Sequence, residues 1–326
     1  MNRRAFVRAA VAGLLAAPLA AEAQRRRVPR LGVLSVLAAP GSDPYSVAFL
    51  DELRALGHVD GRTIAIESRW AEGHPDRLPP LAAELVRLPV DVIVTMGGPL
   101  GARVAQRATS TIPIVWMIMN DPVAQGLVAN LARPGGNLTG PAFQDAELGV
   151  KQLELLRQTV PRLSRVTVIW NAVGARVPVV RAVEDSAQAL GLRLQVQEVR
   201  ELPDLDRALA AAKKWGAQAL LELPSPFFHQ NRKALAALLA THQLPAICET
   251  RAFVDDGCLM SYGASFPAMS RRAAYYVDRI LKGAKPADLP VEQPREFDFI
   301  VNSGTAQTLG LTLPPSLLLQ ATEMLQ

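Results

Sequence analysis

Residues that bind metals or act as nucleophiles are scarce in this 326-residue chain, which has two cysteines and four histidines. The histidines are scattered and show neither an HExxH motif nor any other spacing typical of a metal site. The chain also lacks a G-x-S-x-G elbow, a P-loop, and a G-x-G-x-x-G sequence at the first predicted strand–helix turn. We therefore expect no catalytic residues, no bound metal and no cofactor. The histidines are His58, His74, His229 and His242.

Aromatic residues make up only 5% of the chain and do not alternate with basic runs. The sequence thus lacks the stacking platform of a nucleic-acid-binding protein, and we expect no nucleic-acid partner. The formal net charge is only +5, and the cluster Arg25–Arg27 is typical of a solvated tail. A composition that is 49% hydrophobic and 20% charged indicates a folded globular protein, long enough for two ordinary domains.

No apolar run reaches the roughly 20 residues that a transmembrane helix requires. The run Ala9–Ala21 follows the pair Arg3-Arg4 and ends in the small-x-small sequence Ala21-Glu22-Ala23, which is typical of an export signal peptide. The arginine pair resembles a twin-arginine signal, although an ordinary Sec signal can carry two arginines. We expect residues 1–23 to be removed before Gln24. With no cysteine near this site for a lipid anchor, the mature protein should be soluble and periplasmic, not embedded in the membrane.

The two cysteines, Cys248 and Cys258, are ten residues apart and match no CxxC redox or zinc signature. An oxidising compartment would allow them to form a disulfide. Two buried free thiols are the simpler alternative, and the sequence leaves both open.

Short apolar runs alternate with amphipathic segments of helical length, which is typical of parallel strand–helix–strand units. The strands predicted in the first half are Arg30–Val36, Thr63–Arg69, Val90–Thr95, Ile112–Met119 and Leu138–Phe143. The predicted helices are Tyr45–Leu56, with an apolar stripe at Val47, Leu50 and Leu53; Asp76–Leu88, with Asp76 as its N-cap; a segment opening at Leu100; and Pro122–Ala132. Gly57 is suited to end the first helix, because glycine readily adopts a positive φ.

The same alternation restarts at Glu147, so the chain carries two repeats that predict two doubly wound α/β lobes. The predicted helices of this half are 147–159, 177–190, 205–215 and 231–242, and the strands are 166–170, 193–199, 219–223, 245–248 and 258–262. The remaining segments predict a long helix over Pro267–Lys282, a strand over Phe297–Val301 and a closing helical segment over Leu309–Leu325. The long helix has Met269, Ala273, Tyr276 and Ile280 on one face.

Several motifs, in order, make the chain resemble the ABC-transporter substrate-binding protein family whose better-known members handle tryptophan and tyrosine. The resemblance covers Pro29–Gln326. Its motifs are Ala48-Phe49-Leu50-Asp51-Glu52-Leu53-Arg54 with Gly57, Asp91–Thr95, Asn120-Asp121-Pro122-Val123, Ala132-Arg133-Pro134-Gly135-Gly136-Asn137-Leu138-Thr139-Gly140, Met260-Ser261-Tyr262-Gly263, Ile280–Pro294 and Leu309–Leu318.

The resemblance implies a type I periplasmic binding protein fold, in which two lobes close on a small molecule and deliver it to a membrane permease. It also implies three crossovers between the lobes, here near Phe143–Glu147, Gly263–Phe266 and Gln293–Phe297. The first lobe would then comprise residues 28–143 and 264–294, and the second 144–263 and 295–326. An amino-acid-like or small aromatic ligand is the expectation that the family favours.

Open α/β sheets bind ligands at the carboxyl ends of their strands, which is where the family places its ligand too. Gly97 and Gly98 follow a predicted strand and open a helix, where the backbone can approach an anionic group. The alternative is a purely structural role, because a tight strand–helix turn needs the same two glycines. Many relatives have a Ser or Thr after the glycine, whereas Pro99 here offers neither a hydroxyl nor an N–H group.

Asp121 follows the fourth strand, where its carboxylate could accept a hydrogen bond from a ligand or cap a helix beginning at Pro122. The other candidates at strand ends are Ser35, Asn171, Ser225 and Glu249. The side chain of each could equally hydrogen-bond the backbone of its own turn. Tyr262, beside a predicted crossover, could stack on a flat ligand or pack at the hinge. Trp116 lies within a strand and is predicted to be core.

Two other functions use a similar architecture. A two-lobed racemase or isomerase of the two-cysteine kind needs one thiol from each lobe, but Cys248 and Cys258 both lie in the second repeat. A ligand-sensing module of a signalling system remains an alternative, although an export signal argues against a cytoplasmic repressor.

Overall fold

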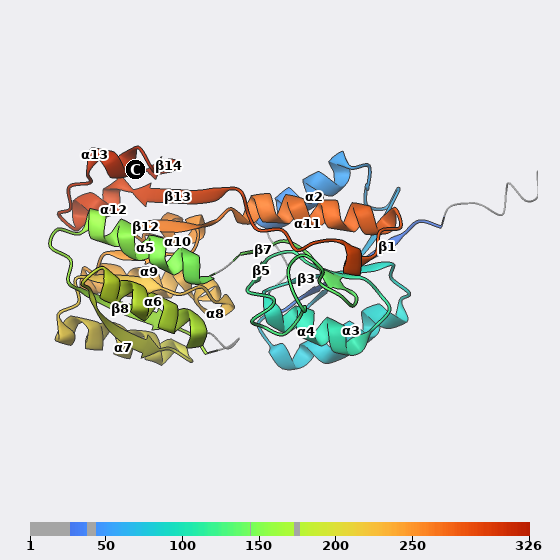
Figure 1. Ribbon diagram of the computed structural model, residues 1–326, viewed down its shortest axis with the longest axis horizontal. Helices are drawn as coiled ribbons and strands as arrows, with labels where there is room; N and C mark the ends of the chain where they lie inside the picture. Colours follow the sequence, from blue (N-terminus) through green and yellow to red (C-terminus); the bar gives the residue numbers. More distant parts are fainter. Residues whose placement is uncertain (1–26, 38–43, 144, 173–176) are drawn as a thin grey trace, which may run out of the picture.

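The computed structural model describes residues 27–37, 44–143, 145–172 and 177–326. The predicted signal peptide lies outside these residues. Within them, two α/β lobes stand side by side, each built on its own largely parallel sheet (Figure 1). This confirms the predicted fold class.

The sheet of the first lobe has the strand order β2-β1-β3-β4-β6, and all of its pairings are parallel. Its strands are β1 (Arg30–Ser35), β2 (Ala65–Trp70), β3 (Val92–Met96), β4 (Ile114–Trp116) and β6 (Leu138–Thr139). A separate two-stranded pair, β5 (Met119–Asn120) and β7 (Ala142–Phe143), continues toward the second lobe.

Helices cover both faces of this sheet, which is why its central strands β1, β3 and β4 consist mainly of buried apolar residues, whereas the edge strand β2 is only half-buried. On one face lie α2 (Pro44–Ala55) and α11 (Phe266–Leu281), and on the other α3 (Leu78–Arg87) and α4 (Pro99–Ala108) (Figure 1). Alternate strand residues point to opposite faces, so Val92 and Val94 pack in the cluster with α2 and α11, whereas Ile93 packs in the cluster with α3 and α4. The predicted apolar face of the long helix is buried, as expected.

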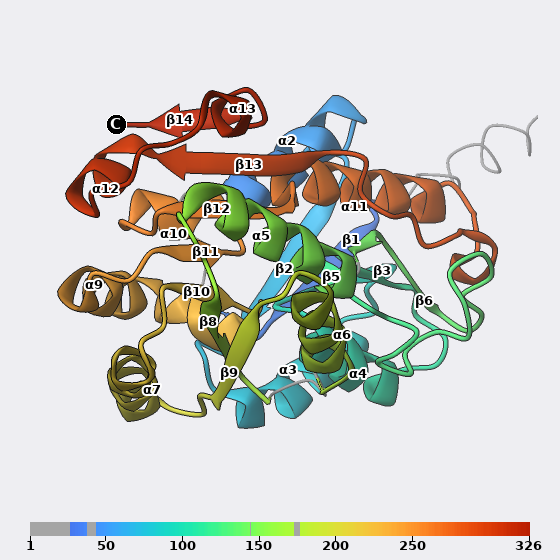
Figure 2. The ribbon, with the colours of Figure 1, turned by 60° about the vertical axis from the view of Figure 1, so that its left-hand side comes forward.

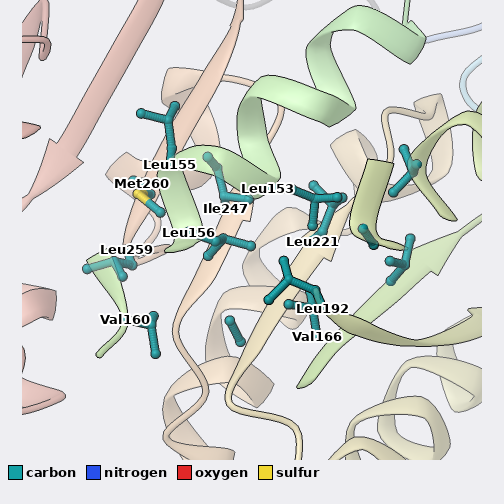
Figure 3. Close-up of a cluster of buried hydrophobic side chains, with 14 of the residues drawn as sticks. Leu153, Leu155, Leu156, Val160, Val166, Leu192, Leu221, Ile247, Leu259 and Met260 are labelled. Atoms are coloured by element: carbon teal, nitrogen blue, oxygen red, sulfur yellow. The ribbon is translucent and has the colours of Figure 1, made fainter. Parts of the chain in front are cut away.

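The second lobe contains a seven-stranded sheet with the order β14-β13-β12-β11-β10-β8-β9. Its strands are β8 (Arg165–Trp170), β9 (Arg193–Glu198), β10 (Ala219–Glu222), β11 (Ala246–Cys248), β12 (Met260–Ala264), β13 (Phe297–Asn302) and β14 (Glu323–Leu325). Figure 2 shows α5 (Asp145–Thr159) and α6 (Val177–Ala189) on one side, with α7 (Leu202–Trp215) and α9 (Arg232–His242) on the other. Figure 3 shows the core beneath α5, where Leu153 and Leu156 approach Leu221 and Ile247.

Three connections join the lobes (Figure 1). The chain passes from β7 to α5, returns from β12 to α11, and passes a third time through Glu292–Glu296 into β13. Because β13 enters from the first lobe, beside the end of β12, it runs antiparallel to β12. The remaining short helices are η1 (Pro75–Arg77), α8 (Pro226–Gln230), α10 (Arg251–Asp255), η2 (Pro286–Asp288), α12 (Ser303–Thr308) and α13 (Pro315–Leu318).

Several local predictions were wrong. In α2 the buried face is formed by Ser46, Phe49 and Leu53, whereas Val47 and Leu50 are 44% and 42% exposed. The segment predicted as the helix Pro122–Ala132 makes only turns and bends, closed by backbone hydrogen bonds such as those from Gly126 N–H to the carbonyl of Val123 at 2.9 Å and from Leu127 N–H to the carbonyl of Pro122 at 3.0 Å.

Other errors concern the ends of elements. Asp76 lies inside η1, so Arg77 and not Asp76 is the N-cap of α3. The predicted strand Ile112–Met119 divides into β4 and β5. The chain end contains α13 and the strand β14 in place of one helix, because Pro314 and Pro315 restrict the backbone midway through it.

Two smaller predictions were confirmed. Gly57 ends α2 with a φ of +93°. Trp116 is fully buried, and its indole N–H donates to the carbonyl of Pro141 at 2.8 Å. Cys248 and Cys258 are both buried free thiols.

Candidate ligand-binding site

A cavity lies between the two lobes and contains about 650 Å³ of space not filled by atoms, including some open to solvent. The first lobe and α11 contribute Leu37, Tyr45, Met96, Gly97, Gly98, Pro99, Met117, Ile118, Met119, Asn120, Phe143 and Phe266. The second lobe contributes Ser225, Pro226, His229 and Glu249. We call this space the inner cavity. Its wall is mainly apolar on the first lobe and mainly polar on the second.

The turn after β3 brings the backbone of the first lobe to the cavity. Gly97 and Gly98 have φ values of +85° and +80°, a region that favours glycine. A Cβ at Gly97 would lie 2.3 Å from Cγ1 of Val36, so a side chain there would displace the strand-end packing. This turn leads directly into α4, whose N-terminal end therefore faces the cavity.

Three methionines form the apolar part of the first-lobe wall. Met96 ends β3, Met117 directly follows β4, and Met119 begins β5. Methionine side chains are flexible and polarisable, which suits contact with flat or irregular apolar groups.

Short turns hold the polar wall of the second lobe. Ser225 is the N-cap of α8, and its hydroxyl oxygen accepts from the backbone N–H of Phe228 at 3.2 Å. Glu249 follows β11, and its N–H donates to the buried carboxyl of Glu222 at 3.0 Å. Beneath this turn, burial raises the pKa of the Cys248 thiol. A protonated, buried thiol is a poor nucleophile.

A side-chain hydrogen bond between Tyr45 and His229 spans the lobes at this cavity. The hydroxyl of Tyr45, on α2, lies 2.9 Å from Nε2 of His229, on α8, and the two rings meet edge to face. The Tyr45 ring also meets Phe266 edge to face, and Phe266 in turn contacts Phe143.

A family model described as ABC transporter substrate binding protein matches residues 30–325. The chain belongs to this family. A tyrosine-binding protein of Clostridioides difficile is 24% identical over 289 residues, which cover 88% of this chain and 82% of the relative.

Solved structures agree on the fold of this substrate-binding protein. A conserved domain protein from Vibrio cholerae superposes with a TM-score of 0.85 and 25% identity, covering 91% of this chain and 100% of the other. An ABC domain from Streptococcus pneumonia in complex with L-Trp superposes with a TM-score of 0.84 and 22% identity, covering 91% of this chain and 99% of the other. The predicted family and the type I periplasmic binding protein fold are therefore confirmed.

The substrate-binding protein brings four of the predicted site residues to the inner cavity: Gly97, Gly98, Ser225 and Glu249. The other four lie elsewhere among the described residues. Ser35 is buried, and its Oγ accepts from the N–H of Leu37 at 3.0 Å. Asn171 is buried, and its amide donates to the carbonyl of Val199 at 2.7 Å.

Asp121 lies next to the lining residue Asn120 and has an uncommon positive φ of +42°. Tyr262 stacks on Phe297, with the ring centroids 5.9 Å apart and the planes 4° from parallel. It lines a small cavity beside the connections between the lobes, and burial raises the pKa of its hydroxyl. This geometry favours the hinge-packing role over ligand stacking.

Sequence reasoning missed the aromatic and methionine residues of the wall, and it treated His229 only as one of four scattered histidines. A signal for the methionines does exist, because Met96 directly follows the predicted strand Val90–Thr95 and Met119 ends the predicted strand Ile112–Met119. Tyr45 and His229 are 184 residues apart, and no local pattern connects them.

Three further observations bear on function. No helix in the described ranges has the length and apolar character needed to cross a membrane. Within the same ranges, no three His, Cys, Asp or Glu side chains gather as metal ligands. Cys248 and Cys258 both belong to the second lobe, so the one-thiol-per-lobe arrangement of a two-cysteine racemase does not occur here.

Proposed function

We propose that this substrate-binding protein takes up a small molecule in the inner cavity, closes its lobes around it and presents it to an ABC permease. The observation that carries the proposal is the composition of the wall, which both lobes supply from the carboxyl ends of parallel strands. A ligand that contacts both walls binds the closed arrangement better than the open one and so shifts the balance toward closure.

The ligand that fits this wall best is an amino acid or a small aromatic compound. Phe143, Phe266 and the three methionines suit an apolar or flat body, while Ser225 and Glu249 offer polar contacts from the second lobe and Asn120 offers one from the first. The names of a tyrosine-binding relative and of a structural neighbour in complex with L-Trp support the same choice. For the ligand contacts we propose Gly97, Gly98, Ser225 and Glu249, and structural roles for Ser35, Asn171 and Tyr262.

The lobe boundaries that we propose are 28–143 with 264–294 and 144–263 with 295–326. Sheet membership supports them: the strands of the five-stranded sheet fall within the first set, and those of the seven-stranded sheet fall within the second except for Ala264, the last residue of β12.

Export is part of the proposal and is supported by the family, whose members are typically exported, and by the pattern of residues 1–23. We infer cleavage before Gln24, use of the twin-arginine route and a periplasmic location. N-terminal sequencing of the periplasmic fraction should begin at Gln24, and replacing Arg3 and Arg4 by lysine should block export. A chain that still begins at Met1 would contradict the inference.

Calorimetric titration of the mature protein against amino acids, nucleobases and small aromatic acids tests the binding function. We expect saturable binding of at least one aromatic amino acid or aromatic acid, with a smaller radius of gyration by X-ray scattering when it is bound. Saturable binding without compaction would argue against closure. Substitution of Glu249 by Gln should weaken the binding of a ligand that carries an ammonium group.

A further inference from the structure

A second cavity adjoins the inner one and differs from it in chemistry. This outer cavity contains about 1830 Å³ of unfilled space, including open solvent, and its wall is charged. Arg232 pairs with Asp256 at 2.9 Å there, and Arg251 pairs with Asp255 at 3.4 Å and with Glu323. Because Tyr45, His229, Glu249 and Phe266 line both cavities, these four residues form the partition between them.

Within the partition, the Tyr45–His229 hydrogen bond at 2.9 Å connects the first lobe to the second. Its partners are held in place on each side. The ring of Tyr45 packs edge to face on Phe266, and the ring of His229 packs edge to face on Phe253, which is buried in the second lobe. Each side chain is therefore anchored in its own lobe, and opening the cleft must break the bond between them.

The short helix α8 makes this contact together with two others. Pro226, His229 and Gln230 stand at positions i, i+3 and i+4, so they share one face of the helix. That face meets the first lobe at two glycines as well. A Cβ on Gly98 would lie 3.9 Å from Cγ of Pro226, and one on Gly73 would lie 3.5 Å from Oε1 of Gln230.

We propose that α8 is the closure latch of this protein, with Tyr45 and His229 as the positioning pair that stabilises the closed state and seals the inner cavity from the outer one. This role rests on the proposed hinged function but not on any particular ligand, since both partners belong to the protein. Removing the bond should therefore shift the balance of open and closed states even without ligand.

Pulsed electron paramagnetic resonance on the full mature chain measures this balance directly. Spin labels on Arg87→Cys in α3 and Lys213→Cys in α7 would report on lobe separation, because both residues are exposed and the helices α3 and α7 lie on the side of the molecule away from the connections (Figure 1). The native thiols, Cys248 and Cys258, are 0% and 1% exposed and should stay unlabelled.

We expect Tyr45→Phe to lower the ratio of closed to open protein about three- to tenfold, the effect of one net hydrogen bond. His229→Leu should do the same, and the double variant should add little to either single change, because the two residues act as one pair. His229→Gln, whose amide reaches about as far as Nε2, should retain part of the closed population. Tyr275→Phe on α11 is the matched control, since Tyr275 contacts Arg272 and Tyr276 within its own helix.

The outcomes separate the latch from the binding function. Unchanged distance distributions in Tyr45→Phe and His229→Leu, with and without a ligand that compacts the wild type, would overturn the latch and leave the binding function intact. If no ligand in the panel binds but Tyr45→Phe still opens the free protein, the latch stands and the binding proposal fails. Equal effects of Tyr45→Phe and Tyr275→Phe would also overturn the latch.

Discussion

The backbone N–H of Glu249 donates a hydrogen bond to the side chain of Glu222, with 3.0 Å between the nitrogen and Oε2. Glu222 is the last residue of β10, and Glu249 directly follows the neighbouring strand β11. A fully buried side chain on one strand thus fixes the turn that carries a lining residue of the inner cavity on the next.

Glu222 should therefore act on ligand binding without lining the cavity. Glu222→Ala leaves the buried N–H of Glu249 without this acceptor, which should lower the free energy of unfolding by about 1–3 kcal/mol and weaken ligand binding. Glu222→Gln is the matched control, because its amide oxygen can still accept the bond. Urea unfolding and calorimetric titration measure the two effects. Equal stability of the Ala and Gln variants would contradict this role.

Gly97 should tolerate no side chain. Gly97→Ala introduces two penalties: about 1–2 kcal/mol for a Cβ at positive φ, and about 1–3 kcal/mol for the contact with Val36. Gly61→Ala isolates the first penalty, because Gly61 has a φ of +72° but a Cβ there would meet no atom within 4 Å. We expect Gly97→Ala to lower the melting temperature more than Gly61→Ala. Ligand binding should be lost in Gly97→Ala and kept in Gly61→Ala. An equal drop in melting temperature in the two variants would show that the Val36 contact is unimportant.

A charge network centred on the buried Asp278 of α11 reaches the turn that follows α2 and should make stability depend on pH. Asp278 is almost fully buried, and its carboxylate lies 2.9 Å from Nε2 of His58 and 2.8 Å from Nζ of Lys282. Burial alone would raise the pKa of Asp278, but the hydrogen bonds from Lys282 and His58 outweigh it and hold this pKa below its usual value of 3.8.

Since this pKa is lower in the folded than in the unfolded state, the ionised carboxylate stabilises the fold above about pH 4, and this contribution is lost as the pH falls below 3.8. Asp278→Asn should lower the free energy of unfolding by about 1.5–3 kcal/mol at pH 7, the range for hydrogen bonds to a charged group. Near pH 3 the loss should be smaller. Asp51→Asn removes a surface ion pair and should change stability by less than about 0.5 kcal/mol. A cost for Asp278→Asn that does not vary between pH 7 and pH 3 would contradict the assignment.

Much of the fold could be predicted because its determinants are local. Apolar runs bounded by glycine or proline identify strands such as β3, and glycine at positive φ identifies the end of α2. The buried face of α2 could not be predicted in this way. Val47 and Leu50 fit the helical period as well as Phe49 does, and only docking against α11 selects Phe49 and Leu53.

The candidate site was predictable only in part, because tertiary contacts decide which side chains reach the cavity. Ser35, Asn171, Ser225 and Glu249 all stand at carboxyl ends of strands, but Ser35 and Asn171 turn to backbone groups nearby and leave the cavity to the other two. Sequence indicates where a polar residue stands, not which partner its side chain selects. The Tyr45–His229 pair depends on how two lobes meet, which no segment of sequence encodes alone.

Asn120 and Asp121 provide the last test, because these neighbours differ in position relative to the inner cavity. Asn120 lines the cavity, whereas Asp121 does not appear among the described lining residues and has a positive φ. Asn adopts this backbone region about as readily as Asp, so Asp121→Asn preserves the turn while it removes a charge.

We therefore expect Asp121→Asn to leave ligand affinity within about twofold of the wild type, and Asn120→Ala to weaken it by about 0.5–1.5 kcal/mol, the net value of a neutral hydrogen bond. Melting temperatures measured alongside the titrations would show whether either variant acts through stability. An Asp121→Asn variant that loses about 1.5–3 kcal/mol of affinity with an unchanged melting temperature would place its carboxylate on a cationic ligand group. Asp121 would then reach the ligand from behind Asn120, and the first lobe would hold the ligand by charge as well as by apolar contact.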